Sequence, residues 1–241
     1  EIAESLTLVV ANDALPQEDW VRAKALSWMA SLLHFGKLLQ IPLVLLHEQT
    51  SVSYRDLFEE FCKGDLEPFP VLDEVSSFFV QHAEGMQQGG PEFVPSKDWL
   101  NMWWPTFEYA YIDLCVNGKL DQFYREAEGL LEAMLRRRSL PLPEGLLHDA
   151  MVLNRSLLKQ PMQTEDLELE LTYNLWELYL AAIQGKNIPL EERASTYRIC
   201  RTKMTWPSWE EWCREVVWYG NKRGAYFYGN DSVIPHLAGH H

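Results

Sequence analysis

Residues 206–228 constrain the fold more than any other part of this chain, because large aromatic rings and charged side chains are interspersed along them. Four of the ten tryptophans and three of the ten tyrosines fall within these 23 residues. Such rings bury a large area for little loss of side-chain entropy, and their polar atoms need hydrogen-bond partners. The stretch is therefore expected to form either a densely packed core helix or one wall of a ligand pocket, and the sequence leaves both readings open.

The composition indicates a folded domain with an acidic surface. Hydrophobic residues make up 47% of the 241, which is enough for a substantial core. The formal net charge of −14 disfavours contact with phosphate backbones and anionic lipid, since no broad basic segment offsets it. Arg136, Arg137 and Arg138 form a basic run at the end of a helical pattern, where cations stabilise a helix C-terminus. We therefore expect neither a nucleic-acid partner nor a membrane partner.

The most apolar region, residues 29–46, is interrupted by His34, Lys37, Gln40 and Pro42. A membrane-spanning helix needs roughly 18 or more nearly uncharged residues, so this region is expected to be a core segment. Cys62, Cys115, Cys200 and Cys213 are widely spaced and contain no CxxC pair. They are expected to be reduced, mostly buried thiols of a cytoplasmic protein.

Hydrophobic periodicity predicts a mainly α fold, an irregular helical domain of about seven to nine helices with two or three short marginal strands. Pro16 is expected to begin a first helix that continues to about Leu39 and that Pro42 stops. Ser96 is expected to cap a later helix that Pro105 kinks. Caps and apolar spacing predict further helices near residues 53–64, 69–82, 120–134, 144–159, 174–184 and 208–220.

The expected strands are short. Residues 6–10 and 225–228 each form a run typical of a strand, and residues 167–171 alternate between leucine and glutamate. That alternation favours a half-buried strand, although Leu171, Leu175 and Leu178 also fit a helix. We expect one helical domain over residues 1–238, with a subdomain break near 85–95 as the alternative. Residues 239–241 resemble the start of a purification tag and are excluded from any metal site.

The individual reactive residues do not form a complete catalytic motif. His47 and Glu48 begin like a zinc-protease motif, but Ser51 stands where the second histidine is needed. Cys213 is expected to be buried as a small hydrophobic side chain rather than to act as a nucleophile. Several carboxylates lie among aromatic residues, where burial could raise a pKa and produce an acid or base. They are Glu108, Asp113, Glu177, Glu210 and Glu215.

Two helix ends combine ring surface with hydrogen-bonding groups, as contacts in an apolar pocket require. One is the start of the helix predicted near residue 174, and the other is the end of the helix predicted near residue 220. Pairing of the neighbouring short strands would bring both ends together. The expected substrate-binding residues are Tyr173, Asn174, Glu177, Trp218, Tyr219 and Lys222. The alternative is that these residues only pack the helix ends.

Two parts of the chain contain sequence segments that resemble those of one protein family. The first part contains Pro16-x-x-Asp19-Trp20, Ser27-Trp28, His34-x-x-x-Leu38-Leu39-Gln40 and Val52-Ser53-Tyr54-Arg55-Asp56. The second contains Tyr173-Asn174-Leu175-Trp176 and Glu215-Val216-Val217-Trp218-Tyr219-Gly220-Asn221-Lys222-Arg223-Gly224-Ala225-Tyr226. Together they resemble the C-terminal region that follows the radical barrel in cobalamin-binding radical S-adenosylmethionine proteins. The resemblance covers most of the chain.

This resemblance implies an accessory C-terminal domain that contributes substrate contacts to a larger radical enzyme or closes its active site. The sequence contains neither the CxxxCxxC that holds a four-iron four-sulfur cluster nor an Asp-x-His-x-x-Gly for cobalamin. We therefore expect no cofactor in this chain. The cluster, S-adenosylmethionine and cobalamin are expected in the parent protein, with upstream domains of the same polypeptide as partners and a small molecule as substrate. Two alternatives stay open: a freestanding helical protein-interaction module with an aromatic groove, and a small enzyme built on buried carboxylates.

Overall fold

The computed structural model describes residues 9–202, 205–218 and 233–235, and within them the chain is mainly α-helical with short strands, which confirms the predicted fold class. The helices are α1 (Gln17–Ala30), π-helix η1 (Ser31–Phe35), α2 (Gln40–Thr50), α3 (Tyr54–Lys63), α4 (Pro70–Gln87), α5 (Thr106–Val116), α6 (Leu120–Arg137), α7 (Leu146–Leu157), α8 (Leu175–Ile183), α9 (Trp209–Trp212) and π-helix η2 (Cys213–Trp218). The strands are β1 (Phe93–Ser96), β2 (Met102–Pro105), β3 (Leu167–Tyr173), β4 (Glu192–Ile199) and β5 (Val233–Pro235).

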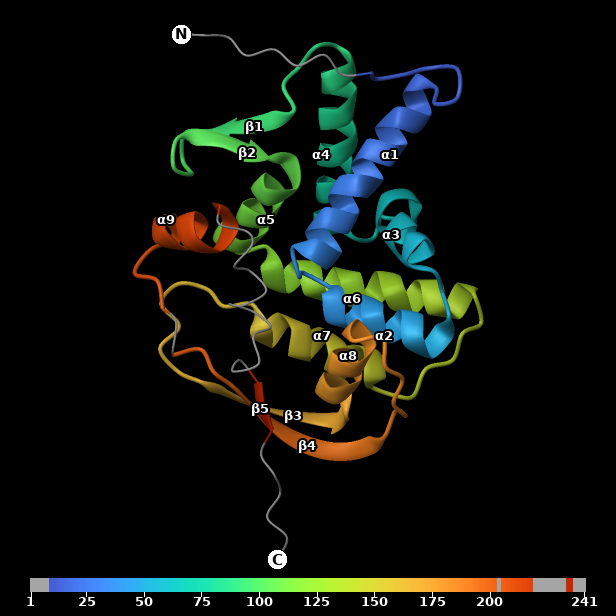
Figure 1. The fold of residues 1–241 in the computed structure, drawn as a ribbon, viewed down its shortest axis with the longest axis vertical. Helices are drawn as coiled ribbons and strands as arrows, with labels where there is room; N and C mark the ends of the chain where they lie inside the picture. The colour runs from blue at the N-terminus through green and yellow to red at the C-terminus, as the bar shows by residue number, and fades with distance from the viewer. Residues whose placement is uncertain (1–8, 203–204, 219–232, 236–241) are drawn as a thin grey trace, which may run out of the picture.

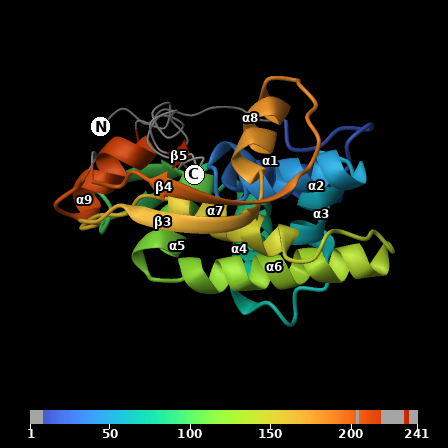
Figure 2. The ribbon, with the colours of Figure 1, turned by 90° about the horizontal axis from the view of Figure 1, so that it is seen from below.

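The helices cross in layers. Helices α1 and α4 lie side by side, and α2, α6 and α7 cross below them in the view of Figure 1. Seen at right angles, α6 and α8 lie on opposite faces of the molecule, with α2 and α7 between them (Figure 2). One continuous core includes Phe79, before the proposed break near residues 85–95, and Tyr111, after it. The expectation of a single domain stays a prediction, which this shared core favours.

The predicted first helix is wrong at its end. The α-helical part stops at Ala30, η1 continues it to Phe35, and a turn then leads into α2. Pro42 does not stop a helix. It lies in the first turn of α2, where a residue without an N–H leaves no helical hydrogen bond unmade. A proline in an apolar pattern fits a helix start as well as a helix stop, and here the helices before and after Lys37 meet at 98°.

The helix predicted from Ser96 is also wrong. Ser96 ends β1, and its hydroxyl accepts the Trp99 N–H at 3.1 Å inside the turn of a β-hairpin. Strands β1 and β2 pair antiparallel, with Phe93 opposite Pro105. The helix begins only at Thr106, so Pro105 precedes it rather than kinking it. The spacing from Trp99 to Phe107 matched a helical stripe by chance, because the strand alternation covers only a few residues.

The alternation at residues 167–171 forms a strand, which settles the choice that the sequence left open. Strand β3 pairs antiparallel with β4, and β4 pairs antiparallel with β5, giving the order β3-β4-β5. Neither β4 nor β5 was predicted. Of the strand predicted at residues 6–10, only Val9 and Val10 are described, and they lie outside any strand. The strand predicted at 225–228 lies outside the described residues.

The predicted caps are confirmed at two helices. The Ser53 hydroxyl accepts the Asp56 N–H at 3.1 Å at the start of α3, and the Ser208 hydroxyl accepts the Glu211 N–H at 3.2 Å at the start of α9. Each bond satisfies a backbone donor that the helix itself leaves without a partner. The sequence located these starts because side-chain capping depends only on nearby residues.

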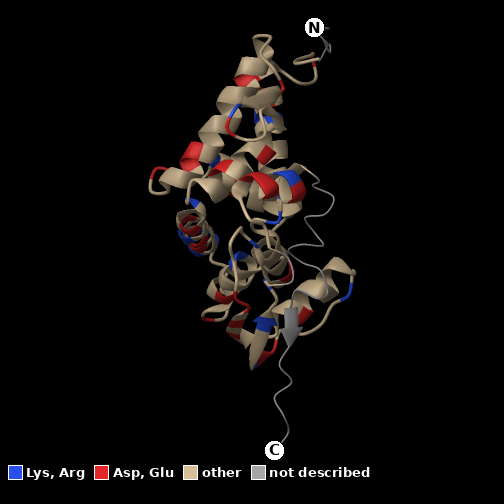
Figure 3. Cartoon of the chain, turned by 90° about the vertical axis from the view of Figure 1, so that its left-hand side faces the viewer, with Lys and Arg blue, Asp and Glu red and all other residues tan. Residues whose placement is uncertain are grey.

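Charged residues of both signs are interspersed on the surface. Lys and Arg positions lie next to Asp and Glu positions along the helices in Figure 3. The basic run lies at the end of α6, where Arg137 donates to Glu60 at 2.5 Å and Arg138 lies 3.5 Å from Asp56. Among the described residues, no single helix is both long enough and apolar enough to cross a membrane. Two consecutive helical segments would have the required length and composition only if taken together, and they meet at 98°; they are Gln17–Phe35 and Gln40–Thr50.

Candidate functional site

Tyr173 and Asn174, two of the predicted binding residues, are buried where β3 runs into α8. The Tyr173 hydroxyl donates to the Glu144 carbonyl at 2.9 Å. The Asn174 side chain accepts the Glu191 N–H at 2.9 Å and donates to the Pro189 carbonyl at 3.0 Å. These bonds attach the start of α8 to neighbouring loops, which corresponds to the packing role that the sequence left open.

Glu177 accepts the Tyr197 hydroxyl at 2.7 Å and so joins α8 to β4. Trp218 ends η2 with 50% of its surface exposed. In Figures 1 and 2, α8 lies apart from α9, the helix that η2 continues. Tyr219 and Lys222 lie outside the described residues, so the grouping of all six residues in one pocket stays a prediction.

The tryptophans that begin the aromatic stretch belong to the core. Trp212 is fully buried, stacks on Tyr111 with ring centroids 5.7 Å apart, and donates to the Lys159 carbonyl at 2.9 Å. Trp206 is also buried, and its indole nitrogen donates to Glu215 at 3.2 Å. In this described part of the stretch the rings pack a helix against α5.

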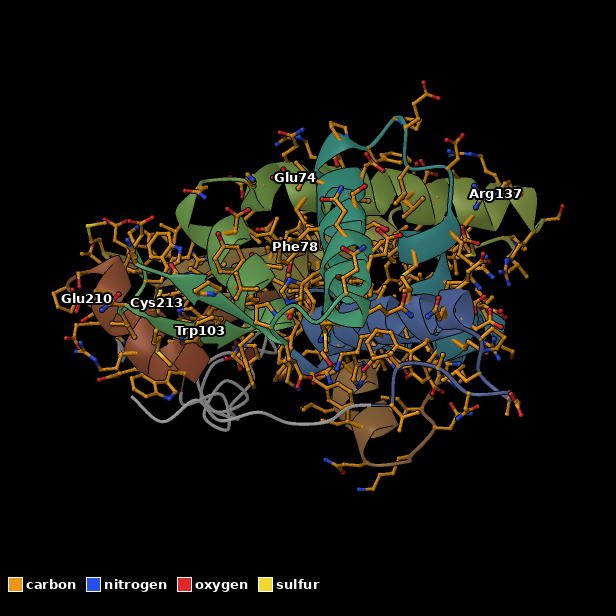
Figure 4. The ribbon with its side chains drawn as sticks, turned by 90° about the horizontal axis from the view of Figure 1, so that it is seen from above. Glu74, Phe78, Trp103, Arg137, Glu210 and Cys213 are labelled. Atoms are coloured by element: carbon orange, nitrogen blue, oxygen red, sulfur yellow. The ribbon has the colours of Figure 1, made fainter. Side chains whose placement is uncertain are left out.

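A second aromatic surface lies on the hairpin. Trp103 and Phe93 expose 55% and 45% of their surface, whereas Trp104, the next residue along β2, is fully buried. Side chains alternate across a strand, so one ring enters the core and its neighbour points away from it. Figure 4 places Trp103 at the same end of the molecule as Glu210 and Cys213, and Arg137 at the other end.

A pocket of about 540 Å³ opens between η1, α2, α3 and α8. A volume of this size falls within the range of small-molecule sites, which combine apolar walls with a few polar groups. Lys37, in the turn between η1 and α2, is the one lysine or arginine among the described residues that line it. The pocket is lined by His34, Phe35, Lys37, Gln40, Val44, Tyr54, Phe58, Tyr179, Ala182 and Ile183.

Gly36 and Lys37 make the sharp turn at the polar end of this pocket. The Gly36 N–H donates to the Ser31 carbonyl at 2.6 Å, and a Cβ on Gly36 would lie 2.5 Å from the Leu32 carbonyl oxygen. Only glycine fits there. Lys37 has a φ of 68°, in the left-handed region, which costs a residue with a Cβ roughly 1–2 kcal/mol. Short π-helical turns such as η1 occur frequently at functional sites.

Asn154 on α7 holds this turn from behind and is fully buried. Its oxygen accepts the Ile41 N–H at 3.0 Å, which satisfies a donor at the start of α2. Its nitrogen lies 3.0 Å from the Lys37 carbonyl, 2.8 Å from the Leu38 carbonyl and 2.6 Å from the Tyr124 hydroxyl. The Tyr124 hydroxyl in turn donates to the Leu38 carbonyl. A buried network of this kind fixes one backbone geometry, and with it the position of Lys37.

The hydrogen bonds of Gln40 determine which ring nitrogen of His34 carries the proton. The Lys37 ammonium donates to the Gln40 oxygen, and the Tyr179 hydroxyl donates to the same oxygen at 2.7 Å. Because an ammonium can only donate, the oxygen must face it, and the Gln40 nitrogen then faces His34 Nε2 at 3.2 Å. That amide nitrogen donates, so His34 Nε2 accepts and the neutral ring carries its proton on Nδ1.

The His34 ring is held in this neutral form. Burial and then the Lys37 charge lower the pKa of His34 below its usual value of 6.5. Its Nδ1 atom is buried and has no hydrogen-bond partner among the described residues. A buried donor without a partner is uncommon and costs free energy, so it marks a place where an acceptor from outside the chain would be favourable.

Lys37 contributes a positive charge to the pocket. Burial lowers the pKa of its ammonium from 10.5 to about 8, so the group stays mostly protonated at neutral pH. Burial also raises the pKa of the Tyr54 and Tyr179 hydroxyls, which therefore remain neutral. The residues that line the pocket in the described part of the chain include no carboxylate.

Aromatic rings form one wall. The Tyr54 ring lies edge-on to His34, with centroids 5.8 Å apart, and it stacks on His47 at 4.3 Å. Phe58 lies 6.4 Å from Tyr54 with the ring planes 25° apart. Phe35 is 71% exposed. These rings, with the aliphatic side chains of α2 and α8, offer an apolar surface beside Lys37.

The described residues contain no cluster of three or more His, Cys, Asp or Glu able to hold a metal ion. All four cysteines are free thiols, and burial raises the pKa of Cys62 and Cys213 to about 12. Such thiols are poor nucleophiles at neutral pH. The prediction that Cys213 is a buried hydrophobic side chain is confirmed, since none of its surface is exposed.

Comparison with known proteins adds no relative: no protein-family model matches the chain, and no curated protein matches it.

The pocket at Lys37 was missed by sequence reasoning. His34, Lys37 and Gln40 were noted only as interruptions of an apolar run. Their closeness in the sequence was the available signal, although His34 lies in η1, Lys37 in the turn and Gln40 at the start of α2 rather than on one helix face. Tyr179 and Asn154 come from distant helices, and nothing in the local sequence connects them with Lys37.

Proposed function

We propose that this chain is a helical ligand-binding domain whose pocket at Lys37 receives a small organic molecule. The observation that carries the proposal is the pocket of about 540 Å³ in which aromatic rings lie beside the Lys37 ammonium, whose burial has a free-energy cost that its lowered pKa reflects. The left-handed backbone at Lys37 and the unsatisfied His34 Nδ1 add to this cost. Several unfavourable features at one pocket support a binding role.

We further propose that the domain contributes substrate contacts to a larger cobalamin-binding radical S-adenosylmethionine enzyme. The resemblance of two segments to that family supports this, and we propose that the contacts lie in the pocket at Lys37. The four free thiols suit a cytoplasmic protein, where disulfides are rare. The iron–sulfur cluster, S-adenosylmethionine and cobalamin would belong to other domains of the same polypeptide.

Ligand-observed NMR with a set of one-ring and two-ring aromatic compounds tests the pocket. Ile183 lines it and is 53% exposed, so Ile183→Trp should cover the opening without disturbing the core. Gln184→Trp, at the next and also exposed position, is the matched control. We expect saturation transfer to compounds in the wild type and in Gln184→Trp, and a clear loss in Ile183→Trp. Equal signals in all three folded proteins would place binding elsewhere.

The link to a radical enzyme has a separate test. The coding sequence upstream of Glu1 should contain a CxxxCxxC motif within a few hundred codons, and the longer polypeptide should bind iron after anaerobic reconstitution. In that polypeptide, Ile183→Trp should raise the KM for the substrate more than Gln184→Trp does. A start codon immediately upstream of Glu1 would refute the accessory role and leave the ligand pocket untouched.

The second candidate function is a protein-interaction module. The observation that favours it is the exposed pair Trp103 and Phe93 on the hairpin, because tryptophan often dominates the binding energy of an interface. It predicts a partner whose affinity falls at least tenfold in Trp103→Ala. If the chain instead binds a small molecule in the pocket at Lys37, Trp103→Ala should leave that binding unchanged.

A further inference from the structure

Lys37 carries the only side-chain amine among the described residues that line the pocket. Its ammonium donates to the Gln40 oxygen, which also accepts from Tyr179. An amine that has lost one proton still donates to such an acceptor, and its lone pair is then available to attack a carbonyl carbon. Hydrogen-bond acceptors around Lys37 therefore do not prevent it from acting as a nucleophile.

Aromatic and aliphatic side chains surround this amine. Tyr54 and Phe58 line the pocket with their ring planes 25° apart, and Val44 and Ile183 line it from α2 and α8. Walls of this kind bind aromatic rings through burial and ring contacts. The volume of about 540 Å³ accommodates one or two rings. A ring bound against these residues lies in the same pocket as the amine.

We propose that Lys37 captures an aromatic aldehyde in this pocket as a reversible imine. The inference rests on the proposed ligand-binding function and deepens it, because it names the class of ligand and a covalent step. The amine nitrogen adds to the aldehyde carbon, and the resulting carbinolamine releases the aldehyde oxygen as water, which takes both protons of the amine. A carbon–nitrogen double bond replaces the carbon–oxygen double bond, and no oxidant or reductant is consumed.

The surrounding structure both holds and activates this amine. Asn154 contacts the carbonyls of Lys37 and Leu38, so the nucleophile is held in place before the ligand arrives. Burial lowers the pKa of the Lys37 ammonium to about 8, so about one molecule in ten carries the neutral amine at pH 7. A lysine with the usual pKa of 10.5 is neutral in about one molecule in three thousand. Desolvation in an apolar pocket is one way in which imine-forming lysines are activated.

The test traps the imine by reduction at pH 7. The wild type is treated with 2-naphthaldehyde and sodium cyanoborohydride, and mass spectrometry of its peptides measures the rate at which each lysine acquires the reduced adduct. Lys97, exposed in the hairpin turn, is the internal reference. We expect Lys37 to react at least about tenfold faster than Lys97, because more of it is neutral. The fast adduct should be absent from Lys37→Met and present in Lys97→Met.

The contribution of the pocket is measured separately. Propanal, an aldehyde without a ring, should favour Lys37 over Lys97 less than 2-naphthaldehyde does, because only the ring gains from the apolar walls. Ile183→Trp should slow the labelling of Lys37 by 2-naphthaldehyde, and Gln184→Trp should not. The corresponding alcohol, 2-naphthylmethanol, cannot form an imine, so its saturation transfer reports binding without reaction.

The other outcomes separate the inference from the function on which it rests. Equal labelling of Lys37 and Lys97, with alcohol binding that Ile183→Trp abolishes, would overturn the imine and leave the ligand pocket standing. Fast labelling of Lys37 that neither the ring nor Ile183→Trp affects would overturn the aromatic ligand. Absence of both selective labelling and alcohol binding in the folded wild type would overturn the inference and the proposed pocket together.

Discussion

Replacing Lys37 with methionine should stabilise the folded protein at neutral pH, even though it removes a hydrogen bond. Methionine keeps most of the length of the side chain and fills the same space without a charge. The substitution leaves the left-handed backbone and the Asn154 contacts unchanged, so it isolates the effect of the ammonium. The Gln40 oxygen still accepts from Tyr179 and is not left without a donor.

The magnitude follows from the pKa of Lys37. The difference between 10.5 and about 8 corresponds to at most roughly 3 kcal/mol of unfavourable burial of the charge. The ammonium is only partly buried, and solvent screens it, so we take about half of that value. After subtraction of about 0.5 kcal/mol for the lost bond to Gln40, a net gain of about 1 kcal/mol is expected at pH 7.

The same pKa fixes the sign of the pH dependence. Below pH 8 the folded and unfolded states both carry the proton, and the cost to the wild type is constant. Between pH 8 and 10.5 the folded state releases the proton first, so wild-type stability rises with pH relative to Lys37→Met. The advantage of the variant should therefore shrink by about 1 kcal/mol between pH 7 and pH 10.

Urea unfolding of the wild type, Lys37→Met and Lys97→Met at both pH values measures these differences. Lys97→Met should match the wild type within about 0.5 kcal/mol, as surface substitutions usually do. The reasoning would be refuted if Lys37→Met were destabilised by a similar amount at pH 7 and pH 10. That result would mean that the ammonium holds the pocket together rather than being retained at a cost.

Three further predictions concern the core and the absence of a metal. Trp212→Ala should destabilise the fold by roughly 3–5 kcal/mol, because the ring is fully buried, and Trp212→Phe by less; unchanged urea midpoints would contradict this. Asn154→Ala should cost about 2–4 kcal/mol, and Asn154→Asp should rescue none of it, since its second oxygen would face the Lys37 and Leu38 carbonyls. Recovery of wild-type stability in Asn154→Asp would show that the oxygen alone matters. The chain by itself should bind no iron after anaerobic reconstitution, since its thiols are dispersed; stoichiometric iron with a charge-transfer band would overturn this.

The sequence predicted those features of the fold that depend on neighbouring residues. Ser53 and Ser208 mark helix starts because a cap reaches only a few positions along the chain. The amphipathic pattern of α6 gave its position for the same reason. The hairpin at Ser96 and Pro105 was mistaken for a helix because cross-strand pairing joins residues whose separate patterns are ambiguous.

The candidate site could not be predicted in the same way. Sequence reasoning selected Tyr173, Asn174 and Glu177, and the hydrogen bonds of all three are internal. They join the start of α8 to the loop before α7, to the loop before β4 and to β4 itself. A residue that combines a ring or amide with a polar atom serves packing and binding equally well, so composition does not separate the two. The pocket at Lys37 depends instead on where α8 and α7 fold back, which is a long-range property.

What distinguishes Lys37 from those residues is that its neighbourhood raises its free energy rather than lowering it. The bonds at Asn174 satisfy every group they join, whereas Lys37 combines a left-handed backbone with a charge of lowered pKa beside an unpartnered His34 nitrogen. The buried Asn154 network and Gly36 nonetheless hold Lys37 in one position. Rigid support for a strained backbone and a partly buried ammonium at one pocket is the arrangement expected of a preorganised binding site.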